Sequence, residues 1–261
     1  MRRRKTVELT LNRIYDIYHK KEYVEPDPLQ FLYNYPDWRD REIVGLICSS
    51  LALGRVNSII KAIDEVLNLL PSPRINLLDW ENDEIYDRYG FFRYRFYNGS
   101  DLADLLIAIK ATMEKKGSLN DLFLSCFNVS DDTVLPALNL FIEELNSRTK
   151  LKMLALPSKN SSCKRLMLFL RWMIRSDEVD PGGWKGISPS KLIIPLDTHM
   201  QKVASILRLT ERKDGSMKTA LDITSSLRKY DKEDPVRYDF SLTRPGIHPS
   251  LDYSAFAHLN K

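Results

Sequence analysis

The sequence predicts an all-α protein. Apolar residues recur at helical spacing through most of the chain, whereas no segment alternates apolar and polar residues over the length of a strand. Short clusters of proline and glycine separate the helical segments, as expected for loops between helices. The 261 residues, of which 43% are hydrophobic, suffice to bury a core in one large unit or two smaller ones.

The apolar pattern divides the chain into segments of helical period. Helices are predicted over residues 7–21, 40–70, 101–116, 131–148, 161–176, 197–209, 217–230 and 234–242. A carboxylate just before a helix can accept hydrogen bonds from the free N–H groups in the first turn of that helix. The N-caps expected on this ground are Asp40, Asp101, Asp197 and Asp234. Pro136 is expected in the first turn of its helix, where a missing N–H costs nothing.

Composition restricts the classes of function. The net charge of +4, from 39 basic and 35 acidic residues, permits a nucleic-acid partner without requiring one. The three cysteines lack the paired spacings of a disulfide framework, a zinc site or an iron–sulfur site, so no metal or other cofactor is expected. No apolar segment is long enough to cross a membrane and none follows the charged start as a secretion signal would, so we expect a cytoplasmic protein.

The helix predicted over 161–176 carries a basic edge beside large apolar side chains. On a helical wheel, Lys164, Arg171 and Arg175 fall on one narrow stripe, and Arg165 and Trp172 lie beside it. Arginine suits phosphate oxygens, and tryptophan can lie against a sugar or base. The stripe is therefore either an ordinary solvated helix face or a surface that faces a nucleic acid, and the pattern alone leaves both readings open.

The segment "PLDTHM" adds a carboxylate to this picture. Asp197 opens the helix over 197–209 as its expected N-cap, and an ionised carboxylate there can also stabilise a neighbouring cation. His199 lies just inside the helix start. Without a cluster of cysteines and histidines around it, His199 reads as a packed or capping side chain, or as a contact to substrate, but not as a metal ligand.

The stretches "LPSKNSSCKRLMLFLRWMIR" and "LIIPLDTHMQKVASILRL" resemble the core of the helix-hairpin-helix (HhH-GPD) DNA glycosylase superfamily. In that superfamily a lysine on the helix after the hairpin and an aspartate at the head of a later helix form the catalytic site. The chain resembles in particular a set of uncharacterised bacterial and archaeal proteins that carry "DPGxWKG" and "PLDTHM". Its spacer of 33 positions from Lys164 to Asp197 is similar to the long spacer of the archaeal 8-oxoguanine glycosylase branch.

This resemblance implies a fold and an activity. The fold is a single unit of two helical lobes with a cleft between them: residues 28–177 form the inner lobe, and 1–27 with 178–261 form the second. The activity is a DNA glycosylase with AP-lyase (β-elimination) chemistry on an oxidised purine such as 8-oxoguanine. Lys164 is the implied nucleophile and Asp197 the implied catalytic carboxylate, acting on damaged duplex DNA as a monomer without a cofactor.

Further contacts are expected around this pair. The candidates for holding the extruded base are Trp172, Trp184, Asp239 and His199. For three of them a structural role is the alternative: Trp184 as the anchor of its loop, Trp172 as packing, and Asp239 as a charge on a helix face. The candidates for the DNA backbone are Lys159, Ser161, Ser162, Arg165, Arg171 and Arg175. The usual glycine pair of the hairpin is replaced by "LPSKNSS", so side chains would have to take over its phosphate contact. The four-cysteine iron–sulfur loop of the endonuclease III branch is absent.

Two other functions stay open on sequence grounds. The chain could be a non-catalytic nucleic-acid-binding protein on the same scaffold, which would show salt-sensitive binding without turnover. It could also be a helical enzyme acting on a small nucleotide, in which case its pocket should be closed and lack a flanking positive surface.

Overall fold

The computed structural model describes residues 2–147, 151–156, 161–248, 250–254 and 256. Within these residues it is mostly helical, as the sequence predicts, with one two-stranded hairpin. The α-helices are α1 (Arg2–Tyr18), α2 (Trp38–Leu51), α3 (Val56–Leu67), α4 (Pro73–Asp79), α5 (Asn82–Tyr89), α6 (Gly99–Lys116), α7 (Leu119–Cys126), α8 (Leu135–Leu145), α9 (Lys164–Ile174), α10 (Thr198–Leu207), α11 (Met217–Leu227) and α12 (Asp239–Ile247). The strands are β1 (Arg93–Tyr94) and β2 (Tyr97–Asn98), and short 3-10 helices are η1 (Lys21–Tyr23), η2 (Pro28–Asn34) and η4 (Pro189–Lys191).

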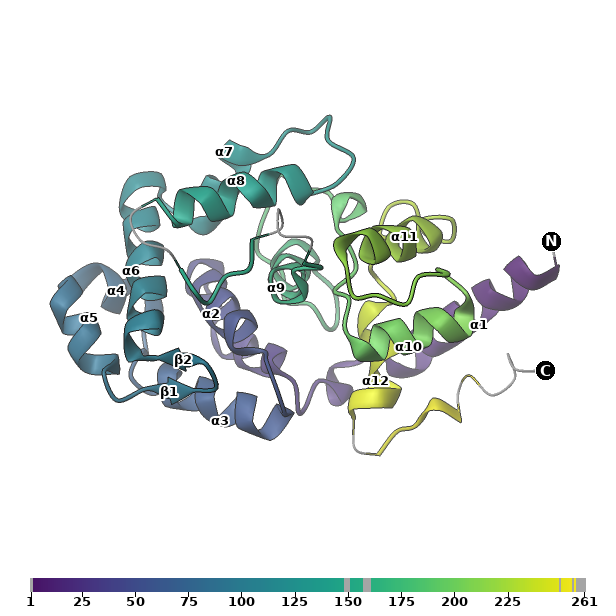
Figure 1. Cartoon of the computed structure of the whole chain (residues 1–261), viewed down its shortest axis with the longest axis horizontal. Coiled ribbons are helices and arrows are strands. Elements are labelled where there is room, and N and C mark those ends of the chain that lie inside the picture. The colour runs from purple at the N-terminus through teal and green to yellow at the C-terminus, as the bar shows by residue number, and fades with distance from the viewer. Residues whose placement is uncertain (1, 148–150, 157–160, 249, 255, 257–261) are drawn as a thin grey trace.

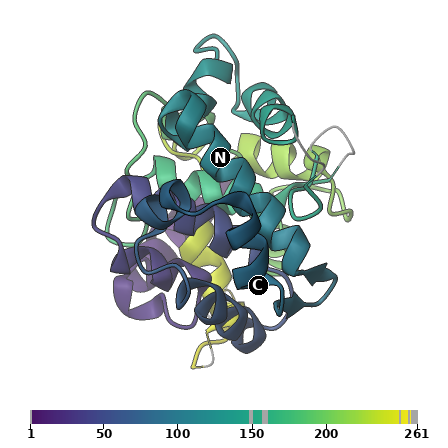
Figure 2. The ribbon, with the colours of Figure 1, turned by 90° about the vertical axis from the view of Figure 1, so that its left-hand side faces the viewer.

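Helix α9 lies in the middle of the molecule, between two groups of helices (Figure 1). On one side lies the group from α2 to α8, in which α2 packs directly against α9. On the other side α1 and α10 both pack against α12, so that the first and last helices of the chain meet. Figure 2 looks at the first of these groups, with the purple to teal helices of the first half of the chain toward the viewer. The lobe boundaries expected from the sequence stay a prediction.

The single helix predicted over 40–70 is wrong, because this segment forms the two helices α2 and α3. Gly54 lies between them with φ of 118°, a conformation outside any right-handed helix. A Cβ atom on Gly54 would lie 2.8 Å from Nη1 of Arg95, so the bare backbone also lets the hairpin approach the turn. Helix α2 starts earlier than predicted, since its N-cap is Asp37 and not Asp40.

The hairpin of β1 and β2 was not predicted. Its strands pair antiparallel over two residues each, with Tyr94 opposite Tyr97, so they are too short to show an alternating pattern. Arg95 at the tip has φ of 53°, which closes the tight turn. The hydroxyl of Tyr94 donates to the carbonyl of Leu53 at 2.6 Å and thereby ties the hairpin to the turn between α2 and α3.

The other predicted helix starts are confirmed in part. The side chain of Asp197 caps α10 and Pro136 lies in the first turn of α8, both as predicted. The N-cap of α6 is Asn98, and Asp101 completes a capping box with it. Asp234 is not an N-cap: a turn follows it over 235–238, α12 begins only at residue 239, and the Asp234 carboxylate pairs with a buried arginine described below.

Candidate functional site

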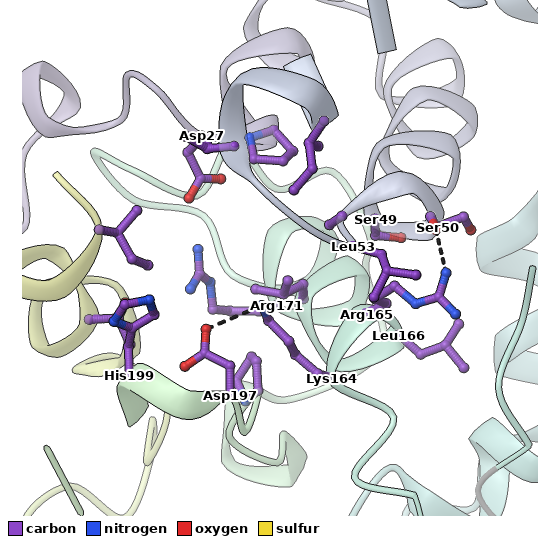
Figure 3. Close-up of a pocket in the computed structure, with 18 of the residues that line it drawn as sticks. Asp27, Ser49, Ser50, Leu53, Lys164, Arg165, Leu166, Arg171, Asp197 and His199 are labelled. Carbon is purple, nitrogen blue, oxygen red and sulfur yellow. Dashed lines mark hydrogen bonds and ion pairs between the residues drawn. The ribbon is translucent and has the colours of Figure 1, made fainter. Parts of the chain in front are cut away.

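A cavity of about 660 Å³ opens where α9, α10 and α12 meet the turn between α2 and α3 (Figure 3). Its wall also includes residues 26–28 at the start of η2 and residues 153–155 before α9. Pockets that bind small molecules or extruded bases commonly have volumes of about 300–1,000 Å³. Segments distant in the sequence therefore build one cavity of the size of a small-molecule binding site.

Lys164 and Asp197 meet in the wall of this cavity, as Figure 3 shows. The distance from Lys164 Nζ to Asp197 Oδ2 is 3.2 Å, and the two side chains are 36% and 13% exposed. Lys164 is the first residue of α9, directly after Cys163, whose left-handed φ of 48° turns the chain into the helix. The sequence pattern predicted Asp197 at a helix start and Lys164 inside a helix over 161–176, whereas the helix begins at Lys164 and the tertiary structure brings the two helix starts together.

The Asp197 carboxylate has a fixed orientation because its two oxygens have separate partners. Oδ1 accepts the backbone N–H of Met200 at 2.8 Å, as an N-cap does, and Oδ2 faces the Lys164 ammonium group. A carboxylate held in this way can accept a proton from the amine or stabilise a cation that develops beside it. The pair thus combines a nucleophile with an adjacent base, open to the cavity.

Arg171 is internal, which corrects the surface stripe expected from the helical wheel. It is 3% exposed; its Nε donates to Asp180 Oδ1 at 3.1 Å and its Nη1 to Asp239 Oδ2. Burial alone would lower the pKa of Arg171, but the charges of Asp180 and Asp239 outweigh it and raise that pKa. Arg171 and Asp239 line the cavity as a paired charge, so this arginine is not a free cation for phosphate.

Arg175 is buried in the same way, so its expected place among the DNA-backbone contacts is corrected. It is 3% exposed, and its Nε donates to Asp180 Oδ2 at 2.8 Å. Its other guanidinium nitrogens pair with Asp177 and Asp234. These carboxylates come from the loop after α9 and from the segment before α12, and no periodicity within α9 could reveal them.

The two candidate stacking tryptophans are both buried. Trp172 is 1% exposed and lines the cavity, but its ring is enclosed in the core and presents no open face to a base. Trp184 is 5% exposed and lies outside the cavity wall, with its ring centroid 5.1 Å from that of Phe169. Its Nε1 donates to Glu42 Oε2 at 2.7 Å. Trp184 therefore anchors its loop, which corrects its expected role in base stacking.

Glu42 gives a prediction for the pH dependence of stability. Its carboxylate is 1% exposed and accepts N–H groups of Leu119, Asn120 and Trp184, yet burial outweighs these bonds and raises the pKa of Glu42 to about 7. The folded protein then holds a proton that the unfolded chain releases above the ordinary glutamate pKa of 4.5, so stability falls as pH rises from 4.5 through 7. The loss is on the order of 3 kcal/mol.

Urea unfolding at pH 5 and pH 8 measures this loss. Glu42→Gln should remove this pH dependence of the free energy of unfolding, because the amide does not titrate. The variant should also be less stable at both pH values, because the NH₂ group of glutamine faces an N–H donor that Glu42 accepts. Glu84→Gln at an exposed ion pair is the matched control and should keep the wild-type dependence. An unchanged slope in Glu42→Gln would assign the pH dependence to other groups.

Of the remaining candidates, Asp239 and His199 lie in the cavity wall, as do Ser161, Ser162 and Arg165. The two serines are engaged locally: Ser161 Oγ accepts the N–H of Cys163 at 3.2 Å, and Ser162 Oγ donates to the carbonyl of Leu196 at 3.4 Å. Arg165 donates to the carbonyl of Ser50 and stays partly exposed. Lys159 lies outside the described residues.

The sequence did not point to Asp27 and Arg244, although both line the cavity. Arg244 Nη2 lies 2.8 Å from Asp27 Oδ2 and is 3% exposed, so the pair joins α12 to the start of η2. Asp27 precedes Pro28 and caps η2 with its side chain, a signal of a helix start that carries no information about a cavity. Only the fold brings this pair to the site.

The described residues contain no group of three or more histidine, cysteine or acidic side chains that could hold a metal ion. Within the same part of the chain, none of the helices combines the length and the apolar character that crossing a membrane requires. The charged groups that line the cavity are the Lys164 amine, the carboxylates of Asp27, Asp197 and Asp239, and four arginines.

Comparison with protein families gives one match, which covers residues 27–248 and is described as a protein of unknown function, DUF2400. The chain belongs to the DUF2400 family. The matched range includes both Lys164 and Asp197 and, apart from Pro26, every residue of the cavity wall. No curated protein and no solved structure matches the chain. The matched part of this chain thus contains the lysine–aspartate pair of the cavity wall.

Proposed function

We propose that the protein is a DNA glycosylase with AP-lyase activity on an oxidised purine, with Lys164 as nucleophile. The observation that carries this proposal is the contact of 3.2 Å between Lys164 Nζ and Asp197 Oδ2 in the wall of the cavity. The resemblance of "CKRLMLFLRWMIR" and "PLDTHM" to the helix-hairpin-helix glycosylases supports it independently. The partner is damaged duplex DNA, bound by a monomer without a cofactor.

Base release through an imine requires that an amine and a carboxylate both lie beside C1′ of the sugar. Lys164 Nζ, once unprotonated, bonds to C1′ of the sugar while the bond from C1′ to the base breaks and its electron pair leaves with the base. Positive charge develops on the sugar, and the Asp197 carboxylate stabilises it and receives the amine proton. The nitrogen lone pair then forms the C1′=N bond while the C1′–O4′ bond breaks, and O4′ takes a proton back from Asp197. The resulting imine with the opened sugar permits β-elimination of the 3′ strand.

The cavity suits a base that has left the duplex. Its volume of about 660 Å³ exceeds what a single purine needs, and polar side chains from five segments of the chain line it. The choice of 8-oxoguanine follows from the long spacer of 33 positions, which resembles the archaeal 8-oxoguanine glycosylase branch.

Borohydride trapping tests the proposal. Purified protein is incubated with duplexes that contain one 8-oxoguanine, one abasic site or no damage, and reduced adducts are resolved on a denaturing gel. An adduct with the 8-oxoguanine duplex supports the full activity, and an adduct with the abasic duplex alone supports the lyase chemistry with a different base. Binding of DNA without any adduct would favour the non-catalytic binding protein.

Asp197→Asn separates the electrostatic role of Asp197 from its structural role. Asparagine caps a helix as well as aspartate does, so α10 should keep its start and the protein its stability. Loss of the charge beside Lys164 should slow base release roughly 100-fold or more under single-turnover conditions. A variant that releases the base at the wild-type rate would remove Asp197 from the reaction.

A further inference from the structure

We propose that Tyr253 positions His199 to accept the C2′ proton in the strand-cleavage step, an inference that rests on the proposed lyase function. Tyr253 lies beyond α12, in a segment that the family match over 27–248 does not reach. The N–H of Leu251 donates to the carbonyl of His248 at 3.1 Å, and Tyr253 then contacts His199 in the cavity wall. A residue outside the matched range thereby reaches the site.

The contact between the two side chains is direct. The distance from Tyr253 Oη to His199 Nδ1 is 3.1 Å, and His199 is the second residue of α10, two positions after Asp197. Both side chains press against the backbone of Gly246: a Cβ atom there would lie 2.1 Å from Tyr253 Oη and 2.3 Å from His199 Nδ1. Only a residue without a side chain leaves room for this pair against α12.

Other contacts hold the tyrosine ring in place. Lys202 Nζ lies 3.7 Å from the ring centroid of Tyr253, which is a cation–π contact. The ring of Phe256, which is 1% exposed, has its centroid 6.2 Å away and fixes the segment in the core. The orientation of His199 therefore depends on a segment that is itself packed on both sides.

A hydroxyl is a suitable partner for a histidine that must gain and lose a proton. The Tyr253 oxygen can accept Nδ1–H of the neutral ring and of the imidazolium alike, so the ring need not turn when Nε2 accepts a proton. Burial, followed by the charge of Asp197, raises the pKa of Tyr253 and keeps its hydroxyl neutral. A neutral acceptor orients the ring without holding it in the charged state, as a carboxylate would.

The other ring nitrogen is available to a substrate. His199 lines the cavity, and within the described parts of the chain no side chain or backbone group makes a hydrogen bond to its Nε2. In the cleavage step, Nε2 takes the C2′ proton of the imine. The C2′–H electron pair forms the C2′=C3′ double bond, and the C3′–O bond breaks with its pair leaving on the 3′-phosphate.

The charged and titratable groups around His199 come from four elements. They are Asp197 and Lys202 on α10, Tyr253 on the C-terminal segment, Lys164 on α9, and Asp239 and Arg244 on α12. The other five groups are unaltered when the hydroxyl of Tyr253 alone is removed. Tyr253→Phe keeps the ring over Lys202 and is therefore the sharpest variant.

The test measures imine formation and strand cleavage separately, on an abasic duplex under single-turnover conditions. For Tyr253→Phe we expect borohydride trapping at the wild-type rate and cleavage slowed by about tenfold, the effect of one lost hydrogen bond, with a changed pH profile of cleavage alone. His199→Ala should slow cleavage about 100-fold or more, and free imidazole should restore part of it. Tyr86→Phe, which removes a bond of 2.5 Å to Asp104 outside the cavity, is the matched control and should equal wild type.

The outcomes distinguish this inference from the proposed function. If wild type traps and cleaves and Tyr253→Phe cleaves at the wild-type rate at every pH, the inference is overturned while the lyase function stands. It is equally overturned if trapping and cleavage slow together, or if imidazole fails to rescue a folded His199→Ala, since the pair would then only support the fold. If wild type does not trap the abasic duplex, the proposed function itself fails and this inference falls with it.

Discussion

Lys164→Ala should abolish the borohydride-trapped adduct with both the 8-oxoguanine and the abasic duplex. The imine needs a primary amine at C1′, and no other described amine contacts Asp197 in the cavity wall. Denaturing gels read the loss directly, since the adduct is covalent. This is the largest effect that we expect on activity, because alanine has no amine that could form the covalent bond to C1′.

The variant should stay folded. The Lys164 side chain is 36% exposed, so its ion pair with Asp197 contributes at most about 1 kcal/mol to stability. Lys61→Ala, which removes an exposed lysine of α3 outside this cavity, is the matched control and should trap as wild type does. Trapping by folded Lys164→Ala at the wild-type level would assign the nucleophile to another residue, and loss of trapping in both variants would point to a general loss of DNA binding.

Arg171→Met should destabilise the protein by about 3–5 kcal/mol, the largest effect that we expect on stability. The substitution keeps most of the side-chain volume but leaves Asp239, which is 2% exposed, without the guanidinium that pairs with it. Asp180 keeps its contact with Arg175. Chemical unfolding in urea at pH 7 measures the difference in the free energy of unfolding.

Two further variants show whether the lost charge is the cause. Arg171→Met combined with Asp239→Asn should recover part of the stability, because the uncompensated carboxylate is gone. Arg88→Met breaks an ion pair with Glu84 in which both side chains are 40% exposed, and it should cost less than about 1 kcal/mol. Equal losses in Arg171→Met and Arg88→Met would show that the buried network contributes no more than a surface pair.

The candidate site could be predicted in part because two of its residues are marked by local signals. Lys164 stands at the start of a strongly amphipathic helix, and Asp197 precedes another helix as a capping residue. A capping carboxylate is recognisable from its neighbours alone. Their contact across the cavity was an expectation drawn from the family resemblance, and the geometry has the two groups 3.2 Å apart.

The prediction that Arg171 and Arg175 form a surface stripe on α9 is wrong for a physical reason. Helical period gives the angle at which Arg171 and Arg175 leave the helix axis, but it says nothing about which segments cover that angle. The covering carboxylates, Asp180, Asp234 and Asp239, come from later parts of the chain. A helical wheel therefore cannot distinguish an arginine that pairs with buried carboxylates from an arginine that is exposed to solvent.

The sequence by itself determined that the protein is helical, where most helices lie, and that Asp197 caps one of them. These properties follow from the spacing of apolar residues and from the backbone groups that a helix end leaves free, both of which act within a few residues. Only the tertiary structure decided which charges are buried, that Asp27 and Arg244 join the cavity, and that Tyr253 reaches His199. The Asp27–Arg244 and His199–Tyr253 contacts join residues 217 and 54 positions apart in the chain, where local pattern carries no information.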